Sequence, residues 1–310
     1  MTTLIIGAGA LGCLFGGLLA QNGVPVVLYD TDRQKIERIN RCGLTISELT
    51  DEKANENTIK RKLPLVAVSD LGAVGEVRRI VFAVKTFALA AAAESALPLN
   101  NPQVTAISLQ NGLGNVETLQ KFWQLPQILI GVTYQGAMEQ EAGHILHTGS
   151  GNTLFAPLDA AYLSAAQASA DFFTAHGLPS SAVGDYREPV WQKLMVNSVI
   201  NPVSAVYGLP NGALTEGNPA ADMRALLQEN ATVACAEGFS FDADQLWARA
   251  LETCRRTAQN HSSMLRDVET GRCTEIDELN GALIRLGARH GLPMPVNKDF
   301  WRRVQALTKY

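Results

Sequence analysis

The sequence predicts an α/β domain followed by an all-α domain, and three observations support this. A glycine-rich turn joins the first apolar strand to the first helix. Strand and helix signals then alternate up to a last strand near Ala182, and from Arg187 onward every segment has helical character. The change falls near Gly184-Asp185, so we expect domains over residues 1–184 and 185–310. The absence of a flexible linker sequence favours a packed hinge.

Composition limits the class of protein and the partners. The 310 residues carry 18% charged side chains and a net charge of -4, with no run of Lys or Arg, which disfavours binding to nucleic acid or an anionic membrane. No window approaches the roughly 20 apolar residues of a membrane span. Five cysteines without a CxxC pair favour neither a disulfide framework nor a metal site. We expect a protein of the reducing cytoplasm, and a homodimer is left open.

A glycine motif stands at the first strand-to-helix junction. The apolar run Leu4–Ile6 leads into it, and helical character follows over Cys13–Gln21. Gly7 permits a tight turn, Gly9 lets the backbone approach a pyrophosphate, and Gly12 lets helix and strand pack closely. The motif predicts a Rossmann-type dinucleotide-binding domain, and its candidate cofactor residues are Gly7, Ala8, Gly9, Ala10, Leu11 and Gly12.

The second strand, Val24–Tyr29, ends in Asp30 at about the spacing of the residue that bonds the adenosine ribose. A carboxylate there accepts the ribose hydroxyls of NAD and repels the extra phosphate of NADP. Arg33 lies near enough to oppose this preference, although a solvated arginine in the next helix is the simpler interpretation.

Two later strands end in polar residues. Lys85 directly follows the apolar run Ile80–Val84, and Asn111 follows the strand Val104–Leu109 in a turn that contains two glycines. Carboxyl ends of strands are where open α/β sheets bind ligands. A strand-end lysine in solvent and an ordinary Asn-Gly turn are the alternatives.

The stretch Glu188–Val206 is apolar around almost its whole circumference, which predicts a buried helix. Lys193, Asn197 and Asn201 recur at i, i+4 and i+8 and therefore share one face. An ammonium and two amides on a buried helix suit a small anionic guest, whereas a snorkelling lysine with two internally bonded amides is the alternative. Pro202 predicts that the helix kinks or stops at the end of this polar stripe.

Two further polar groups lie in the helical half. Ser262-Ser263-Met264 falls near the end of a helix expected over Ala243–Val268, and Thr274-Glu275-Ile276-Asp277 resembles a capping box that opens the next helix. In that position the helix dipole would keep Glu275 ionised. Taken alone, such residues are usually structural.

Together these motifs resemble the ketopantoate reductase (2-dehydropantoate 2-reductase) family, and the resemblance runs from residue 1 to about residue 300. The segments that carry it are Gly7–Gly12, Val84-Lys85, Asn111–Gly114, Trp191–Leu194, Asn197–Pro202, Pro210–Gly212, Ser262–Met264 and Thr274–Asp277 with Asn280-Gly281. It implies a Rossmann domain followed by a helical domain, and reduction of 2-dehydropantoate to pantoate by NADPH in the route to pantothenate and coenzyme A.

By this resemblance Lys193 is the general acid and Glu275 bonds the reacting oxygen or the cofactor. The substrate would be held by Asn197, Asn201, Asn211 and Ser263, with Asn111 beside it. Lys85, Asn111 and Ala137 would border the nicotinamide. The two domains would close over the substrate.

One departure bears on the cofactor. NADPH-dependent members usually carry an arginine just beyond the second strand, where this chain has Asp30-Thr31. NADPH therefore follows from the resemblance and NADH from Asp30. Two other functions stay open: reduction of a different 2-oxo acid on the same fold, and a dinucleotide-binding sensor without turnover. The sensor is disfavoured by the joint presence of Lys193, Asn197, Asn201, Ser263 and Glu275.

Overall fold

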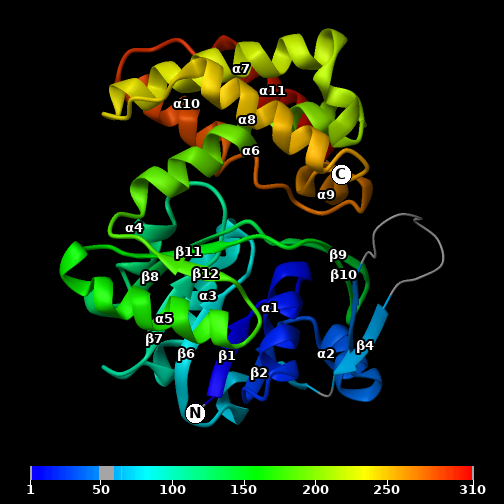
Figure 1. Ribbon diagram of the computed structural model, residues 1–310, viewed down its shortest axis with the longest axis vertical. Coiled ribbons are helices and arrows are strands. Elements are labelled where there is room, and N and C mark those ends of the chain that lie inside the picture. The colour runs from blue at the N-terminus through cyan, green and yellow to red at the C-terminus, as the bar shows by residue number, and fades with distance from the viewer. Residues whose placement is uncertain (1, 49–58, 64, 309–310) are drawn as a thin grey trace. The chain divides into compact units, whose positions relative to one another are not determined.

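The computed structural model describes residues 2–48, 59–63 and 65–308, which divide into two compact units (Figure 1). The first unit holds residues 1–110 and 114–186. The second holds residues 111–113 and 187–310. Each unit has its own hydrophobic core.

The first unit is built on an eight-stranded sheet in which β1 (Thr2–Ile6) is the third strand from one edge. In spatial order its strands are β12 (Ser180–Ala182), β11 (Thr153–Pro157), β8 (Ile128–Thr133), β7 (Thr105–Ser108), β6 (Val77–Phe82), β1, β2 (Val26–Tyr29) and β5 (Val66–Val68). Neighbouring strands from β5 to β8 are parallel, and β11 runs antiparallel to β8. Chain order reverses at β1, so the loops after β1 and β6 flank the position where such sheets bind dinucleotides.

A second sheet has four strands: β4 (Ile59–Leu63), β3 (Leu44–Glu48), β10 (His144–Gly149) and β9 (Gly136–Glu141). The sequence predicts one strand over Ile128–Gly136, but its two ends belong to different sheets. It also predicts an exposed loop or hairpin over Asp51–Lys62. Residues 51–58 lie outside the described residues, and from Ile59 the chain forms β4, which pairs with β3.

Helix α1 (Ala10–Gln21) packs between the two sheets, which explains why it is apolar on every side. Two adjacent glycines allow this close approach. A Cβ on Gly16 would lie 2.8 Å from Leu28 in β2, and one on Gly17 would lie 2.6 Å from Ile46 in β3. The other helices of this unit are α2 (Arg33–Cys42), α3 (Leu89–Ser95), α4 (Asn115–Leu119) and α5 (Leu163–Ala175), with 3-10 helices η1 (Leu71–Ala73), η2 (Thr86–Ala88), η3 (Leu97–Leu99), η4 (Leu125–Gln127) and η5 (Ala160–Tyr162).

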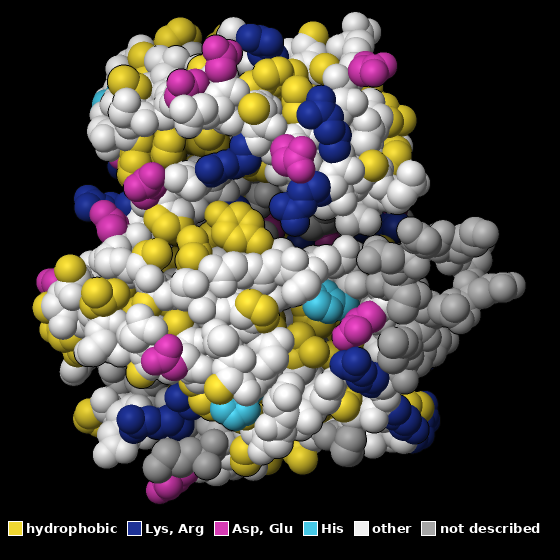
Figure 2. Space-filling view, viewed as in Figure 1, with side chains coloured by type: hydrophobic (Ala, Val, Ile, Leu, Met, Phe, Trp, Pro, Cys, Tyr) yellow, Lys and Arg dark blue, Asp and Glu magenta, His cyan; other side chains and the backbone are white. Residues whose placement is uncertain are grey.

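The described part of the second unit contains helices joined by turns and no strand. Its elements are α6 (Arg187–Tyr207), η6 (Asn211–Thr215), α7 (Gly217–Ala236), α8 (Ala243–Arg256), α9 (Ser263–Glu269), α10 (Asn280–Arg289) and α11 (Pro295–Leu307). The prediction of an α/β domain followed by an all-α domain is thereby confirmed. On the face shown in Figure 2, acidic and basic side chains are interspersed over the described surface.

The helix expected over Ala243–Val268 is wrong, because the chain forms α8 and α9 with a break between them. The backbone N–H groups of Asn211 and Gly212 donate to the carbonyls of Asn260 and Ala258, at 2.9 and 3.0 Å, so these carbonyls pair with η6. A new helix then starts where the Ser262 hydroxyl accepts the N–H of Leu265 at 3.1 Å.

Candidate active site

The polar stripe lies on one continuous helix. α6 carries Lys193, Asn197 and Asn201 four residues apart, so the three side chains occupy the same face. Lys193 and Asn197 are half-buried and Asn201 is buried. Among the described residues, none forms a hydrogen bond with the side-chain amides of Asn197 and Asn201, which leaves these amides available to a ligand.

Lys193 has an unusual acidity for a lysine. Desolvation by burial lowers the pKa of its ammonium from 10.5 to about 8, and the Glu275 carboxylate partly opposes this shift. Glu275 is itself buried, with 8% of its surface exposed. The structure therefore brings together the lysine and the carboxylate that the sequence singles out, 82 positions apart in the chain.

The prediction that Glu275 opens a helix is wrong. The segment from Glu275 to Leu279 forms turns, and α10 begins at Asn280. The N–H groups of Glu278 and Leu279 both donate to the Glu275 carbonyl, at 3.2 and 3.1 Å, which fixes the Glu275 backbone in a tight turn. The environment of its carboxylate is set by burial in this turn and not by the first turn of a helix.

This turn also contacts residues 111–113, which belong to the second unit although they follow the sheet in sequence. The Leu113 N–H donates to the Glu278 carbonyl at 3.2 Å, and a Cβ on Gly112 would lie 2.5 Å from that oxygen. The sequence interpretation gave no role to Glu278. Burial raises the pKa of its half-buried carboxyl, with smaller contributions from Asp277 and Glu275.

The remaining predicted substrate residues differ in their surroundings. Asn211 is buried at the start of η6, where its Nδ2 donates to the Thr257 hydroxyl at 2.8 Å and its Oδ1 has no partner among the described residues. Ser263 is exposed as the first residue of α9. Part of the Asn211 side chain is therefore committed to holding η6 against the segment after α8.

The glycine motif forms the expected strand-turn-helix in the first unit. Gly7 has a φ of 105°, and a Cβ on Gly12 would lie 1.9 Å from the Gly7 carbonyl oxygen, so both positions require glycine. At Gly9, which caps α1, nothing lies within 4 Å of where a Cβ would stand. The first-turn N–H groups of Ala10, Leu11 and Gly12 are thus approachable by a pyrophosphate.

Asp30 is fixed beside this loop. Its Oδ2 accepts the Ala8 N–H at 2.8 Å, and its Oδ1 accepts the Asp32 N–H at 3.0 Å. Arg33, the first residue of α2, is exposed. The residues present therefore fit a dinucleotide whose adenosine ribose meets a carboxylate.

The residues expected at the nicotinamide are spread over different elements. Lys85 is half-buried directly before η2, after the end of β6, and Asn111 is half-buried among the residues that join the second unit. Ala137 is half-buried in β9, which belongs to the four-stranded sheet and packs against α1. Lys85 thus lies in a loop after a strand of the eight-stranded sheet, whereas Ala137 belongs to a strand of the four-stranded sheet.

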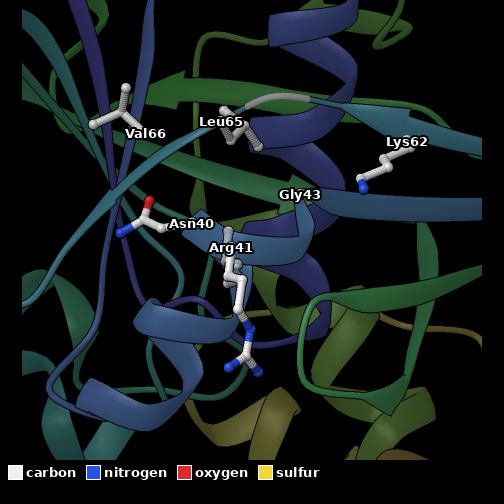
Figure 3. Close-up of a pocket in the computed structure, with 7 residues that line it drawn as sticks. Asn40, Arg41, Gly43, Lys62, Leu65 and Val66 are labelled. Atoms are coloured by element: carbon white, nitrogen blue, oxygen red, sulfur yellow. The ribbon is translucent and has the colours of Figure 1, made fainter.

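A cavity of 490 Å³ lies elsewhere, at the end of α2 (Figure 3). Its wall is formed by Ile39, Asn40, Arg41, Gly43, Lys62, Leu65 and Val66. Asn40 Nδ2 donates to the Ala67 carbonyl at 2.8 Å, and its Oδ1 accepts the Ala67 N–H at 3.0 Å. These two hydrogen bonds hold α2 to β5. The cavity contains none of the residues that the sequence analysis selected.

The described residues contain neither a metal-binding cluster nor a membrane-spanning helix. No group of three or more His, Cys, Asp or Glu side chains there is arranged to hold a metal ion. Within the same part of the chain, every helix is too short or too polar to span a bilayer.

Family models match both units. The model described as ketopantoate reductase PanE/ApbA matches residues 3–160, and the model of its C-terminal domain matches residues 185–308. The 2-dehydropantoate 2-reductase of Halobacterium salinarum is 31% identical over 297 residues, which cover 96% of this chain and 95% of that protein. That of Vibrio cholerae is 30% identical over 308 residues, with 99% and 98% covered.

Solved structures of similar chains include two of different activity. A PanE/ApbA family ketopantoate reductase from Ralstonia eutropha is 30% identical, with a TM-score of 0.87 and 99% and 98% of the two chains covered. The ternary structure of D-mandelate dehydrogenase with NADH and anilino(oxo)acetate is 25% identical, with a TM-score of 0.92 and the same coverage.

Proposed function

Because this chain belongs to the ketopantoate reductase family, we propose that it reduces 2-dehydropantoate to pantoate with a nicotinamide dinucleotide, a step towards pantothenate and coenzyme A. The observation that carries the proposal is the pairing of Lys193, whose pKa is lowered to about 8, with the buried Glu275. A mildly acidic ammonium is the group that a carbonyl reduction requires.

A bound nicotinamide supplies the hydride to the keto carbon. Negative charge develops on the keto oxygen, and Lys193 stabilises this charge and gives the oxygen its proton. With a pKa of about 8, the ammonium is mostly protonated at neutral pH and loses its proton more readily than an exposed lysine. Glu275 acts by orienting the ammonium and keeping it protonated.

We assign the substrate to the polar face of α6. The amides of Asn197 and Asn201 are available for hydrogen bonds with its carboxylate and hydroxyl groups, and Ser263 offers an exposed hydroxyl. Asn211 would contribute through Oδ1, since its Nδ2 already binds Thr257. Asn111 would lie beside the substrate and the nicotinamide, with Lys85 and Ala137 on the nicotinamide side.

For the cofactor we propose that the glycine loop holds the pyrophosphate and that NADH is used at least as well as NADPH. Asp30 supports NADH because its carboxylate is held next to the loop by two backbone N–H groups and would repel a 2'-phosphate. Arg33 is exposed and opposes this preference only if it turns towards the phosphate.

A second candidate is reduction of a 2-oxo acid with an aromatic substituent. The similarity to D-mandelate dehydrogenase, whose structure contains NADH, favours it. The reaction centre would be the same, because Lys193 and Glu275 act only at the keto oxygen, which both substrates have. The two candidates differ in the pocket for the substituent.

Initial rates of nicotinamide absorbance loss distinguish the candidates. We would assay 2-dehydropantoate and phenylglyoxylate, each with NADPH and with NADH. A kcat/KM for 2-dehydropantoate at least about tenfold above that for phenylglyoxylate supports the proposal. The reverse ratio supports the second candidate, and no turnover of either acid by protein that binds the dinucleotide would refute both.

A further inference from the structure

The sequence predicts that the helix kinks or stops at Pro202, and of these two the stop is wrong, because α6 continues past Pro202 to Tyr207. A proline has no N–H, so the carbonyl four residues earlier loses its helical donor. That carbonyl belongs to Ser198, whose exposed fraction is 0%. A buried carbonyl needs another donor, because leaving it unpaired is costly.

Asn280 supplies the missing donor. Its Nδ2 donates to the Ser198 carbonyl at 2.8 Å, and its second N–H donates to Asn297 Oδ1 at 2.9 Å. Asn280 is fully buried and opens α10 directly after the turn that holds Glu275. The Gly281 N–H donates to the Ile276 carbonyl at 2.9 Å, which ties the start of α10 to this turn.

The Asn280 side chain is fixed by a closed ring of hydrogen bonds. Asn297 Nδ2 donates to Asn230 Oδ1 at 2.9 Å, and Asn230 Nδ2 donates to the Ser198 hydroxyl at 2.9 Å. All four members of the ring have an exposed fraction of 0%. They come from α6, α7, α10 and α11, so the ring fixes the register of four helices.

We propose that Pro202 and Asn280 form a positioning pair, in which proline frees the Ser198 carbonyl so that Asn280 can hold the Lys193 helix in register with the Glu275 turn. This inference rests on the proposed roles of Lys193 and Glu275. Proton transfer is sensitive to small displacements, so one buried tether between their elements affects the rate. Both residues are buried and Asn280 Nδ2 donates only within the helical unit, so the pair acts through Lys193 and Glu275.

The first test is a double-mutant cycle in thermal stability, which requires no activity. Asn280→Ala leaves the Ser198 carbonyl without a donor and should lower Tm by about 3 to 10 °C. In the Pro202→Ala background the new N–H of residue 202 can satisfy that carbonyl. There the same Asn280→Ala change should cost about half as much or less.

The second test measures positioning through the pH dependence of kcat. If Asn280→Ala lets the Glu275 turn move from Lys193, the ammonium loses the carboxylate that keeps its pKa up. The alkaline limb of the profile should then shift to lower pH, with kcat reduced about tenfold. A merely structural role would lower Tm without shifting this limb. In the double variant with Pro202→Ala, Tm should return towards the wild-type value, whereas the alkaline limb of the kcat profile should stay at lower pH.

Asn230→Ala is the matched control, because Asn230 belongs to the same ring but donates to the Ser198 hydroxyl instead of its carbonyl. The loss of Tm that it causes should be the same with Pro202 or Ala at position 202.

The proposal is overturned by additive Tm effects of Asn280→Ala and Pro202→Ala, or by an alkaline limb of the pH profile that does not shift in Asn280→Ala. If the Asn280→Ala variant does not fold, the proposal requires that the double variant with Asn280→Ala and Pro202→Ala does fold. A wild-type protein without reductase activity would refute the proposed function while the Tm cycle still decides the pairing.

Discussion

The proposed role of Lys193 as the proton donor predicts how catalysis depends on pH. Desolvation lowers its pKa to about 8 and Glu275 opposes the shift. The protonated form is the acid, so kcat should be constant at lower pH and fall about tenfold per unit above pH 8. Glu275→Gln removes the opposing charge, so the fall should begin at lower pH. Rates from pH 6 to 10 check this, and an identical profile for the variant would contradict the assigned pairing.

Asp30 should decide the choice between the two dinucleotides. Asp30→Asn keeps an oxygen that can accept the Ala8 N–H but removes the charge that repels a 2'-phosphate. The ratio of kcat/KM for NADPH to that for NADH should rise at least about tenfold. Asp32→Asn is the matched control, because Asp32 caps α2 and accepts the Lys35 N–H. An equal rise in both variants would show that general surface charge, and not the ribose position, sets the preference.

The junction of β1 and α1 tests the dinucleotide site at the level of an element. A Cβ on Gly12 would lie 1.9 Å from the Gly7 carbonyl oxygen, so Gly12→Ala must push the helix from the strand. We expect a loss of about 1 to 3 kcal/mol in the free energy of unfolding and weaker NADH binding. Gly75→Ala, in open space, should change neither. Chemical denaturation and titration with NADH measure both quantities.

Some elements could be predicted from the sequence and others could not. The glycine motif, the apolar strands and helix α11 follow from local pattern, and α11 begins at Pro295, a residue type favoured in the first turn of a helix. Helix α6 covers the predicted stretch Glu188–Val206 and does not stop at Pro202, because Asn280, distant in sequence, supplies the donor that Pro202 removes. Similarly, η6 takes the carbonyls that would have continued α8. Both differences come from tertiary hydrogen bonds, which periodicity does not reveal.

The candidate site could likewise be predicted from the sequence only in part. The stripe on α6 follows from helical spacing, whereas Glu275 was found through the resemblance and its helical setting was wrong. Glu278 and the buried ring of asparagines were missed. One signal was present for the ring: a proline in a buried helix implies a carbonyl that needs a donor from another element.

For the whole molecule, the resemblance to ketopantoate reductases is confirmed by family models over both units. The division of the strands between two sheets was not predictable, because β3 and β10 pair across nearly 100 residues. Pairing at this separation depends on the complete fold and leaves no local pattern.

The decisive measurement is the initial rate with 2-dehydropantoate and NADH or NADPH for the wild type, Lys193→Ala and Lys298→Ala. Lys298 is an exposed lysine of the same unit and controls for loss of charge. We expect Lys193→Ala to lower kcat by about 10² to 10⁴-fold with little change in dinucleotide affinity, and Lys298→Ala to keep the wild-type rate. Full activity of Lys193→Ala would contradict the assignment of Lys193 as the proton donor.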